Sequence, residues 1–258
     1  MLRHLSATFA LAACLSLPAA ATVKIAVPTL SGHFDEEMQG RSAAALHAIY
    51  EECGERVQFV QFRWGQHWLA YEDDKSFDAV ALVWDDAGVP GYPSNAYIHS
   101  RNGVAFRADA GFDIQTLQDL KGLRVLGFGG ATNMFPALEK VLPLLGSYWE
   151  APPGFATTQA LVAGDADAFV TDGLIFAIDY MERVKQTGGA YGDSHWPRMK
   201  FTALFEENGD KMHFRSMKKR NEFNTCLARA RNSGAIAKAT EAFVTRYRDI
   251  VGDQVPDH

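Results

Sequence analysis

The sequence predicts an α/β protein built from two units. Apolar runs typical of buried strands alternate with helical segments along the 258 residues. This strand–helix–strand order implies parallel strands with helices on the faces of the sheet. The alternation stops in a long turn-rich segment after residue 84 and resumes at residue 117. We therefore expect two α/β units rather than one.

Composition excludes several classes of protein. With 47% hydrophobic and 22% charged residues, the chain can bury one or two sizeable cores, which excludes a disordered, collagen-like or coiled-coil chain. A net charge of −6 argues against nucleic-acid binding, since phosphate contacts need clustered Lys and Arg. The three cysteines have no CxxC spacing and the histidines are scattered, so neither a metal site nor a cofactor is expected.

The first 21 residues resemble a secretory signal peptide. Arg3 precedes an apolar run from Leu5 to Leu17, which is too short to span a bilayer. Three alanines then give a cleavage site after Ala21, so the mature chain would begin at Thr22 in the periplasm. The segment LAAC also matches the box before a lipidated cysteine, and acylation of Cys14 is the alternative.

The first unit contains three strands and one helix. Val23–Leu30 is a short apolar run that ends in turn residues, and Ser42–Cys53 has helical spacing and stops at a glycine. Val57–Trp64 alternates apolar and polar residues, whereas Phe77–Trp84 is apolar throughout, as in a fully buried strand.

A turn-rich loop over residues 85–102 follows the third strand. In open α/β sheets, ligands bind at the carboxyl ends of the strands, so this loop is a candidate binding region. Gly103–Ala108 then reads as a strand.

The second unit repeats the alternation and leads to a returning segment. We expect strands at Arg124–Phe128 and Ala168–Asp172, one helix over residues 133–146, a second helix that ends at Gly164 and a third that runs through Lys185. Residues 199–207 and 211–217 read as strands that return across a hinge, and two helices, Asn221–Arg231 and Ala235–Arg248, close the chain.

Two cysteines remain after the leader is removed. Cys53 ends the first helix and Cys226 lies in a helix near the C-terminus. An even pair in an oxidising compartment favours a disulfide. Two buried free thiols are the alternative.

Several segments together resemble the polar-amino-acid family of periplasmic solute-binding proteins of ABC transporters. DLKGLRVLGFGGATNMFPALEK is similar to the family's Asp-Leu-Lys-Gly strand, Gly-Thr-Thr loop and helix, and ALVAGDADAFVTD to its Leu-x-x-Gly-x-x-Asp-Ala-x-x-x-Asp signature. The segment from Lys211 to Phe243 is similar to the returning hinge strand and closing helices. The likeness is strongest from Leu117 to Asp172 and weak at residues 31–40 and 85–102.

The resemblance implies a type II fold with two lobes, each a mixed, mostly parallel sheet flanked by helices, joined by a two-strand hinge. It divides the chain into the leader 1–21, a first-lobe segment 22–105, a second lobe 106–210 and a returning first-lobe segment 211–258. A monomer that binds a small molecule and meets a membrane permease or sensor is implied.

The resemblance also implies ligand-binding residues in the second lobe. At Gly130, Ala131 and Thr132 the chain turns into a helix N-terminus, whose free N–H groups favour an anion such as a ligand carboxylate. Asp172 ends a buried strand where family members hold the ligand's ammonium group. A helix N-cap is the alternative role of Asp172, and the sequence does not decide between them.

The first lobe departs from the family pattern. Family members usually have a Gly-x-Ser/Thr after the second buried strand and a carboxylate-binding Arg five residues beyond the hydroxyl. This chain has Val83 in place of the Gly, Asp85 in place of the Ser/Thr and Pro90 in place of the Arg. Arg is the side chain best suited to a carboxylate, and Asp85 has the opposite charge. Arg101 is a substitute anion clamp or an ordinary exposed residue.

Aromatic side chains beside a carboxylate suit an amine or quaternary ammonium ion. The candidates in positions resembling the family cleft are Phe34, Trp64, Trp84 and Tyr97. Their alternative role is packing in the core.

Three functions fit these observations. The first is a non-enzymatic binding protein that closes on a small polar ligand, amino-acid-like or cationic, and delivers it to an ABC transporter. The second is a sensory or accessory protein with the same fold. The third is a dehydratase-like enzyme, for which Asp85, Asp172 and His33 are the candidate acids or bases.

Overall fold

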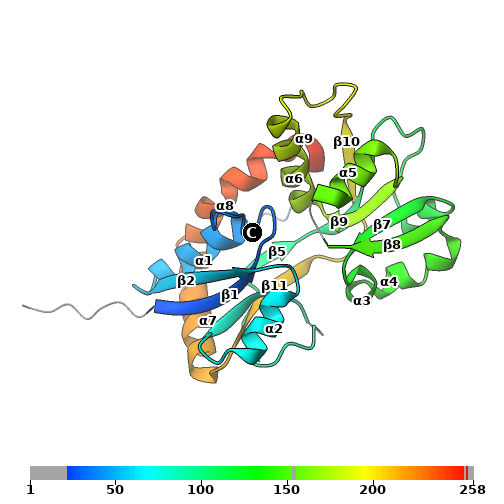
Figure 1. Ribbon diagram of the computed structural model, residues 1–258. Helices are drawn as coiled ribbons and strands as arrows, with labels where there is room; N and C mark the ends of the chain where they lie inside the picture. The colour runs from blue at the N-terminus through cyan, green and yellow to red at the C-terminus, as the bar shows by residue number, and fades with distance from the viewer. Residues whose placement is uncertain (1–21, 86, 153–154, 253, 255–258) are drawn as a thin grey trace, which may run out of the picture.

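The computed structural model describes residues 22–85, 87–152, 155–252 and Gln254. These residues form two sheets with helices packed on them, which lie side by side as two lobes (Figure 1). The predicted α/β two-lobed fold is therefore confirmed. The expected leader, Cys14 included, and Asp86 lie outside the described residues.

The first sheet has the strand order β2-β1-β3-β11-β4. Strand β1 (Thr22–Pro28) pairs in parallel with β2 (Arg56–Phe62) on one side and with β3 (Ala79–Val83) on the other. The returning strand β11 (Asn208–Phe214) is antiparallel to β3. Two short strands from the loop after β3 also pair with β11: β4 (Tyr92–Pro93) and β5 (Ile98–Ser100).

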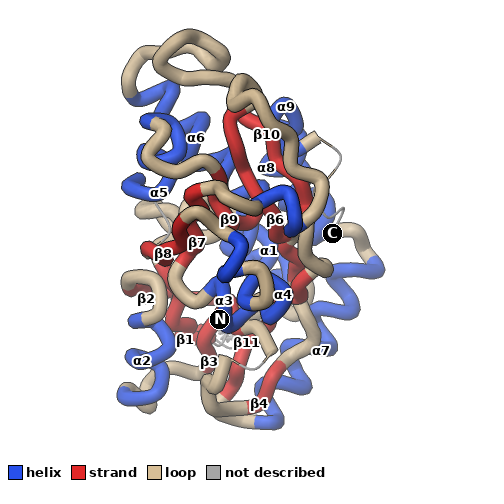
Figure 2. Tube along the Cα trace, turned by 90° about the vertical axis from the view of Figure 1, so that its right-hand side faces the viewer, coloured by secondary structure: helices blue, strands red, loops and turns tan. Residues whose placement is uncertain are grey.

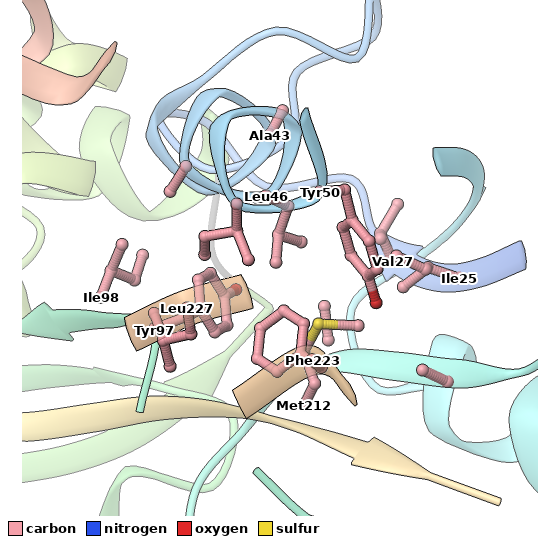
Figure 3. Packing of buried hydrophobic residues seen from close by; sticks show 14 of the residues in the cluster. Ile25, Val27, Ala43, Leu46, Tyr50, Tyr97, Ile98, Met212, Phe223 and Leu227 are labelled. Atoms are coloured by element: carbon pink, nitrogen blue, oxygen red, sulfur yellow. The ribbon is translucent and has the colours of Figure 1, made fainter. Parts of the chain in front are cut away.

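Helices cover both faces of the first sheet because β1 is apolar on both. Ile25 and Val27 point into a core with α1 (Arg41–Glu51) and α7 (Met217–Asn232), while Ala26 faces the cluster beneath α2 (Gln66–Asp73). Figure 3 shows Leu46 and Tyr50 of α1 meeting Phe223 of α7 in the first of these cores. Each fully buried side chain of this size stabilises the fold by roughly 1.5–3 kcal/mol.

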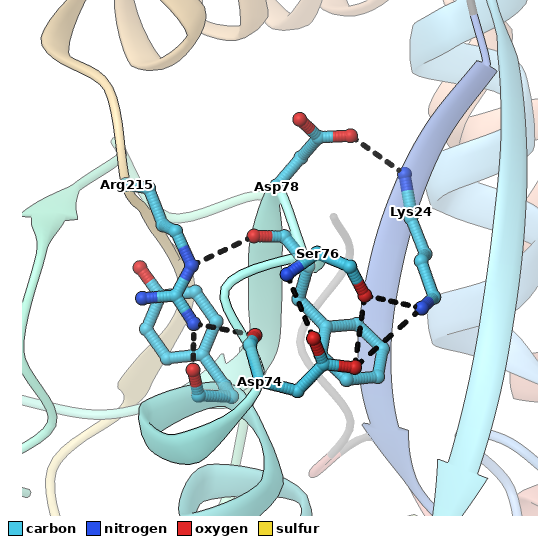
Figure 4. A network of polar contacts seen from close by, with 7 residues as sticks. Lys24, Asp74, Ser76, Asp78 and Arg215 are labelled. Carbon is cyan, nitrogen blue, oxygen red and sulfur yellow. Dashed lines mark hydrogen bonds and ion pairs between the residues drawn. The ribbon is translucent and has the colours of Figure 1, made fainter.

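A polar network ties β11 to the start of β3 (Figure 4). Arg215 follows β11 and donates hydrogen bonds to the carbonyl oxygens of Phe77, Asp74 and Tyr71. Asp78 accepts a hydrogen bond from the backbone N–H of Lys24 at 3.0 Å. Because backbone groups at a turn need partners, this network holds the returning strand in register.

The second sheet has the order β10-β6-β9-β7-β8. β9 (Ala168–Asp172), β7 (Arg124–Phe128) and β8 (Ser147–Ala151) are parallel, whereas β6 (Asn102–Arg107) and β10 (Met199–Ala203) add on antiparallel. The helices α5 (Phe155–Ala163) and α6 (Gly173–Gln186) cover one face. The other face carries the 3-10 helix η1 (Leu117–Leu120), α3 (Ala131–Met134) and α4 (Pro136–Glu139) (Figure 2).

The helix predicted over residues 133–146 is wrong. The segment forms α3, α4 and a 3-10 helix, η2 (Leu142–Leu144), instead of one helix. Pro136 begins α4 and Pro143 lies at the start of η2. A proline has no N–H and clashes with the preceding turn, so it begins a helix more readily than it continues one. Helix α2 and strand β8 were not anticipated.

The chain passes between the lobes at two places that lie side by side. Arg101 alone separates β5 in the first sheet from β6 in the second, and residues 204–207 join β10 to β11. Both passages meet at the carboxyl end of β9, because Asn102 is opposite Asp172. The expected two-strand hinge is present.

The C-terminal segment makes a further link between the lobes. α8 (Ala235–Arg246) packs on α1, but α9 (Arg248–Val251) packs on α6 and β10. Ile250 and Val251 join the core of the second lobe. Gln254 binds the edge strand β10 of the second sheet, since its side chain makes hydrogen bonds to the backbone of Phe201 and Ala203. The division of the chain at residues 105 and 210 stays a prediction.

The expected disulfide is confirmed. Cys53, just beyond α1, bonds to Cys226 of α7 across 173 residues of sequence. Cys226 belongs to the first-lobe core and Cys53 packs against it. A cross-link over so long a loop restricts the unfolded chain strongly.

We expect the double variant Cys53→Ser/Cys226→Ser to be less stable than the native protein by about 2–5 kcal/mol, which corresponds to a fall in Tm of roughly 5–15 °C for a chain of this size. Thermal unfolding followed by circular dichroism measures it. Reductant should lower the Tm of the native protein and leave the double variant unchanged; equal Tm values for the two proteins would contradict the expectation.

Candidate ligand-binding site

A cavity lies between the two lobes beside the strand crossings. It measures about 50 Å³, on the order of the space for three or four water molecules. Its lining includes two carboxylates, several hydroxyl or amide groups and three large aromatic rings. The residues are Leu30, His33, Trp64, Leu82, Trp84, Ser100, Asn102, Phe128, Met134, Thr171, Asp172, Ile175 and Asp210.

Asp172 is one of the two carboxylates. It ends β9 and is the N-cap of α6, where its Oδ1 accepts a hydrogen bond from Ile175 N at 2.9 Å. Its Oδ2 accepts another from Arg101 N at 3.1 Å. Burial raises the pKa of Asp172 despite these bonds. The two roles that the sequence left open thus coincide in one side chain, which both caps α6 and lines the cavity.

Asp210 is the other carboxylate, and sequence reasoning missed it. It lies in β11, and its Oδ2 accepts a hydrogen bond from the Ser100 hydroxyl of β5 at 2.5 Å. Burial, with a smaller contribution from the charge of Asp172, raises the pKa of Asp210 to about 7. This bond joins the two strands that lead into the crossings, so the hinge supplies part of the site.

Arg41 lies behind the cavity and provides the nearby positive charge. It begins α1, is only 2% exposed, and donates from Nη1 to the carbonyl oxygen of His99 at 2.6 Å. Burial lowers its pKa, while Asp172 and Asp210 act in the opposite direction. One buried cation therefore faces two buried carboxylates without being part of the lining.

His33 contributes an uncharged imidazole to the cavity wall. Its Nδ1 lies 2.7 Å from the hydroxyl oxygen of Ser42, and that oxygen also accepts a hydrogen bond from the Tyr97 hydroxyl at 3.2 Å. Burial and the charge of Arg41 lower the pKa of His33 to about 3. The ring is therefore neutral near pH 7.

An aromatic cluster forms the first-lobe wall. The indole rings of Trp64 and Trp84 are stacked with centroids 6.2 Å apart, and Trp68 packs edge-on against Trp84 at 4.8 Å. Both Trp64 and Trp84 line the cavity, and both follow strand ends in the first sheet.

An irregularity in β3 shapes the same wall. Leu82 has φ 55° although it is not a glycine, and the register with β11 shifts between Lys211 and His213. An extra residue of this kind is a β-bulge, and bulges re-aim side chains beside functional sites. Leu82 lines the cavity two residues before Trp84.

The N–H groups at Gly130 and Thr132 already have a carboxylate partner. Glu150 of β8 accepts hydrogen bonds from Gly130 N at 2.7 Å and from Thr132 N at 2.9 Å. The hydroxyls of Thr132 and Tyr148 also donate to it, at 2.9 and 2.8 Å. Burial acts to raise the pKa of Glu150, but these bonds outweigh it and lower the pKa. The predicted anion-binding loop is thus bound to an ionised side chain of the same chain.

Four other expected residues are not in the lining of the cavity, although the backbone N–H of Arg101 bonds to Asp172. Phe34 and Tyr97 are buried in the first-lobe core, where Phe34 packs against Phe59. Asp85 is exposed and pairs with Lys211 at 2.5 Å. Arg101 pairs with Glu207 at 3.2 Å. Of the ten expected ligand-binding residues, the structure brings Trp64, Trp84 and Asp172 together in the lining.

Among the described residues, no group of three His, Cys, Asp or Glu side chains is placed to hold a metal ion. Nor does the described part of the chain contain a helix with the length and apolar character needed to cross a membrane.

Comparison with known structures shows which fold this is. No protein-family model and no curated protein sequence match the chain. Solved structures match over almost their whole length, and they include amino-acid-binding proteins and substrate-binding proteins of ABC transporters. The chain therefore has the two-lobed fold of the type II periplasmic binding proteins.

Three of these structures illustrate the likeness. An ancestral arginine-binding protein bound to glutamine is 20% identical with a TM-score of 0.66, and the match covers 87% of this chain and 98% of that one. A substrate-binding protein of an amino acid ABC transporter from Streptococcus pneumoniae, bound to L-arginine, is 15% identical with a TM-score of 0.65. The match covers 87% of this chain and 95% of that one. An ancestral amino acid-binding protein described as a precursor of cyclohexadienyl dehydratase is 19% identical with a TM-score of 0.65. The match covers 86% of this chain and 95% of that one.

The buried carboxylate of Asp210 predicts a stability that depends on pH. Its folded pKa of about 7 exceeds the value of about 3.9 in an unfolded chain. The folded state therefore holds a proton that the unfolded state has lost, and stability falls as pH rises from about 4 to about 7. In Asp210→Asn this contribution is absent.

Urea unfolding of the ligand-free proteins at pH 4, 5.5, 7 and 8 measures the effect. We expect the native protein to lose up to a few kcal/mol relative to Asp210→Asn between pH 4 and pH 7. Asp113→Asn is the matched control, because Asp113 is exposed and paired with Lys200. A stability difference between native protein and Asp210→Asn that is constant with pH would refute the assignment.

Proposed function

We propose that this chain is a periplasmic solute-binding protein whose lobes close on a small polar ligand and present it to the permease of an ABC transporter. One observation carries the proposal: the cavity is lined from both lobes. Trp64, Trp84 and Asp210 come from the first sheet and its loops, whereas Phe128 and Asp172 come from the second.

Contacts at the rim support closure as the working motion. Ile175 of α6 packs against the first-lobe core, and a side chain at Gly32 would lie 2.7 Å from Ile178 of the same helix. Gly32 also has φ 78°, so the loop after β1 needs glycine both for its conformation and for its closeness to the second lobe. The lobes are thus in contact beside the cavity.

Closure driven by a ligand follows from this geometry. A ligand held by Asp172 in one lobe and Asp210 in the other has its full set of contacts only when the lobes are together. It therefore favours the closed state by its difference in affinity for the two states. The closed form is then a distinct surface that a membrane partner can recognise.

Location and partner rest on further support. The leader expected at residues 1–21 places the mature chain in the periplasm, where a solute-binding protein meets its permease. Substrate-binding proteins of ABC transporters are among the matching structures. We propose a monomer, because one chain supplies both walls of the cavity.

Isothermal titration calorimetry on the purified secreted protein tests the proposal. The panel contains amino acids, polyamines, betaines and small organic acids, and we expect one class to bind with one site per chain. Asp172→Asn should weaken that binding at least tenfold, since a hydrogen bond to a charged group contributes about 1.5–3 kcal/mol. Asp113→Asn should bind like the native protein.

Two results would count against the proposal. No heat from any class of solute would contradict solute binding, provided that the protein is folded. Full affinity in Asp172→Asn would remove this residue from the ligand site.

A further inference from the structure

We infer that the ligand is a small organic cation without a carboxylate group, because the charged side chains among the described residues that line the cavity are two carboxylates, and aromatic rings lie beside them. This inference rests on the proposed function, since it assigns the chemical class of the solute held between the lobes. The supporting observations come from both lobes.

The first observation is that Glu150 satisfies the N–H groups that otherwise invite an anion. Its two oxygens accept four hydrogen bonds of 2.7–2.9 Å, two from the backbone of Gly130 and Thr132 and two from hydroxyls. The backbone register supports this arrangement, because Glu150 is paired with Gly127 of β7, three residues before the turn. A ligand carboxylate would have to displace a bonded, ionised carboxylate.

The second observation concerns the sign of the charge at the cavity. None of the described residues that line it is a lysine or an arginine, and the His33 ring is neutral. Asp172 and Asp210 are the acids of this lining. The one positive charge of Arg41, behind the wall, does not offset both.

A carboxylate ligand would add a third acidic group to a cavity in which burial already disfavours the ionised forms of Asp172 and Asp210. Burying a charge is costly unless an opposite charge or hydrogen-bond donors compensate it. A cation instead gives Asp172 and Asp210 an opposite charge, which favours their ionised forms.

The third observation is the aromatic wall. Trp64, Trp84 and Phe128 line the same cavity as the two carboxylates. The face of an indole ring attracts a cation, most strongly when water is excluded, and carboxylates with aromatic faces together suit an alkylammonium or quaternary ammonium ion.

The size of the cavity agrees with such a ligand. A volume of about 50 Å³ holds a head group of roughly four heavy atoms, judged by the space that buried waters need. A methylated or singly alkylated ammonium group is of this size.

Calorimetry with matched pairs of probes tests the inference. Each pair joins a cation to its carboxylated analogue: tetramethylammonium with glycine betaine, butylammonium with norvaline, and agmatine with arginine. We expect the tightest ligand to lack a carboxylate and its carboxylated analogue to bind at least tenfold more weakly. If the tightest ligand carries a carboxylate, the inference fails but solute binding stands. If no probe and no other solute binds, the proposed function fails, and the inference with it.

The role of Glu150 has its own test in the variant Glu150→Ala. Removing this side chain frees the N–H groups of Gly130 and Thr132, so the affinity for the carboxylated analogue should rise at least tenfold relative to that for the cation. Glu139→Ala, an exposed site on α4, is the matched control and should leave the ratio unchanged. Circular dichroism and retained binding of the cation show whether the alanine variant is folded. An unchanged ratio in folded Glu150→Ala would overturn the exclusion by Glu150.

The aromatic wall predicts a graded effect at Trp84. Replacing it with leucine removes the π face and should weaken binding of tetramethylammonium about tenfold or more, whereas Trp84→Phe should lose less, since phenylalanine retains a weaker face. Calorimetry at pH 8 measures both. Equal affinities in Trp84→Leu and Trp84→Phe would contradict a cation held against this ring.

Discussion

The site depends on two carboxylates that are buried where the chain crosses between the lobes. Removing Asp172 and Asp210 from water costs several kcal/mol each unless other groups compensate. Local structure supplies that compensation: the N-terminus of α6 bonds Asp172, and Ser100 bonds Asp210. Ile175, whose N–H bonds Asp172, lies two residues after the start of α6, and Ser100 lies next to the crossing at Arg101. The hinge and the ligand site are therefore one piece of structure, and any change of lobe orientation alters the setting of both acids.

Glu150 occupies the hydrogen-bond donors at the loop of the second lobe. The backbone N–H groups of Gly130 and Thr132 donate to its carboxylate, which comes from the neighbouring strand β8. These N–H groups are therefore bonded within the protein. The charged side chains among the described residues that line the cavity are Asp172 and Asp210. Together with the indole rings of Trp64 and Trp84, they make it complementary to a positive charge. The bulge at Leu82 lies two residues before Trp84 in this aromatic wall, and the absence of a side chain at Gly32 lets the lobes meet beside the cavity.

Position at a strand end is a local property that the sequence shows. Trp64, Trp84 and Asp172 were expected at strand ends and line the cavity, since the carboxyl ends of parallel strands meet at one edge of a sheet; their role in ligand binding stays a prediction. Phe34 and Tyr97 looked similar in the sequence but pack inward, because the side of a strand or loop that a residue faces depends on register and on neighbours far away in sequence. Asp210 was missed because it lay in the short connection between the strands predicted at residues 199–207 and 211–217, where no motif marks it, whereas in the structure it belongs to β11. The spacing in residues 133–146 suggested one helix, yet two prolines divided it.

The α/β class, the two repeated units and the likeness to two-lobed binding proteins are all present in the sequence by itself, since apolar periodicity and turn residues act over short distances. The disulfide was inferred from a count of two cysteines. Only the tertiary structure placed Asp210 beside Asp172, Arg41 behind them and Glu150 on the loop at Gly130. These groups are far apart along the chain, and their effect on one another depends on distance and on exclusion of water, which folding alone decides.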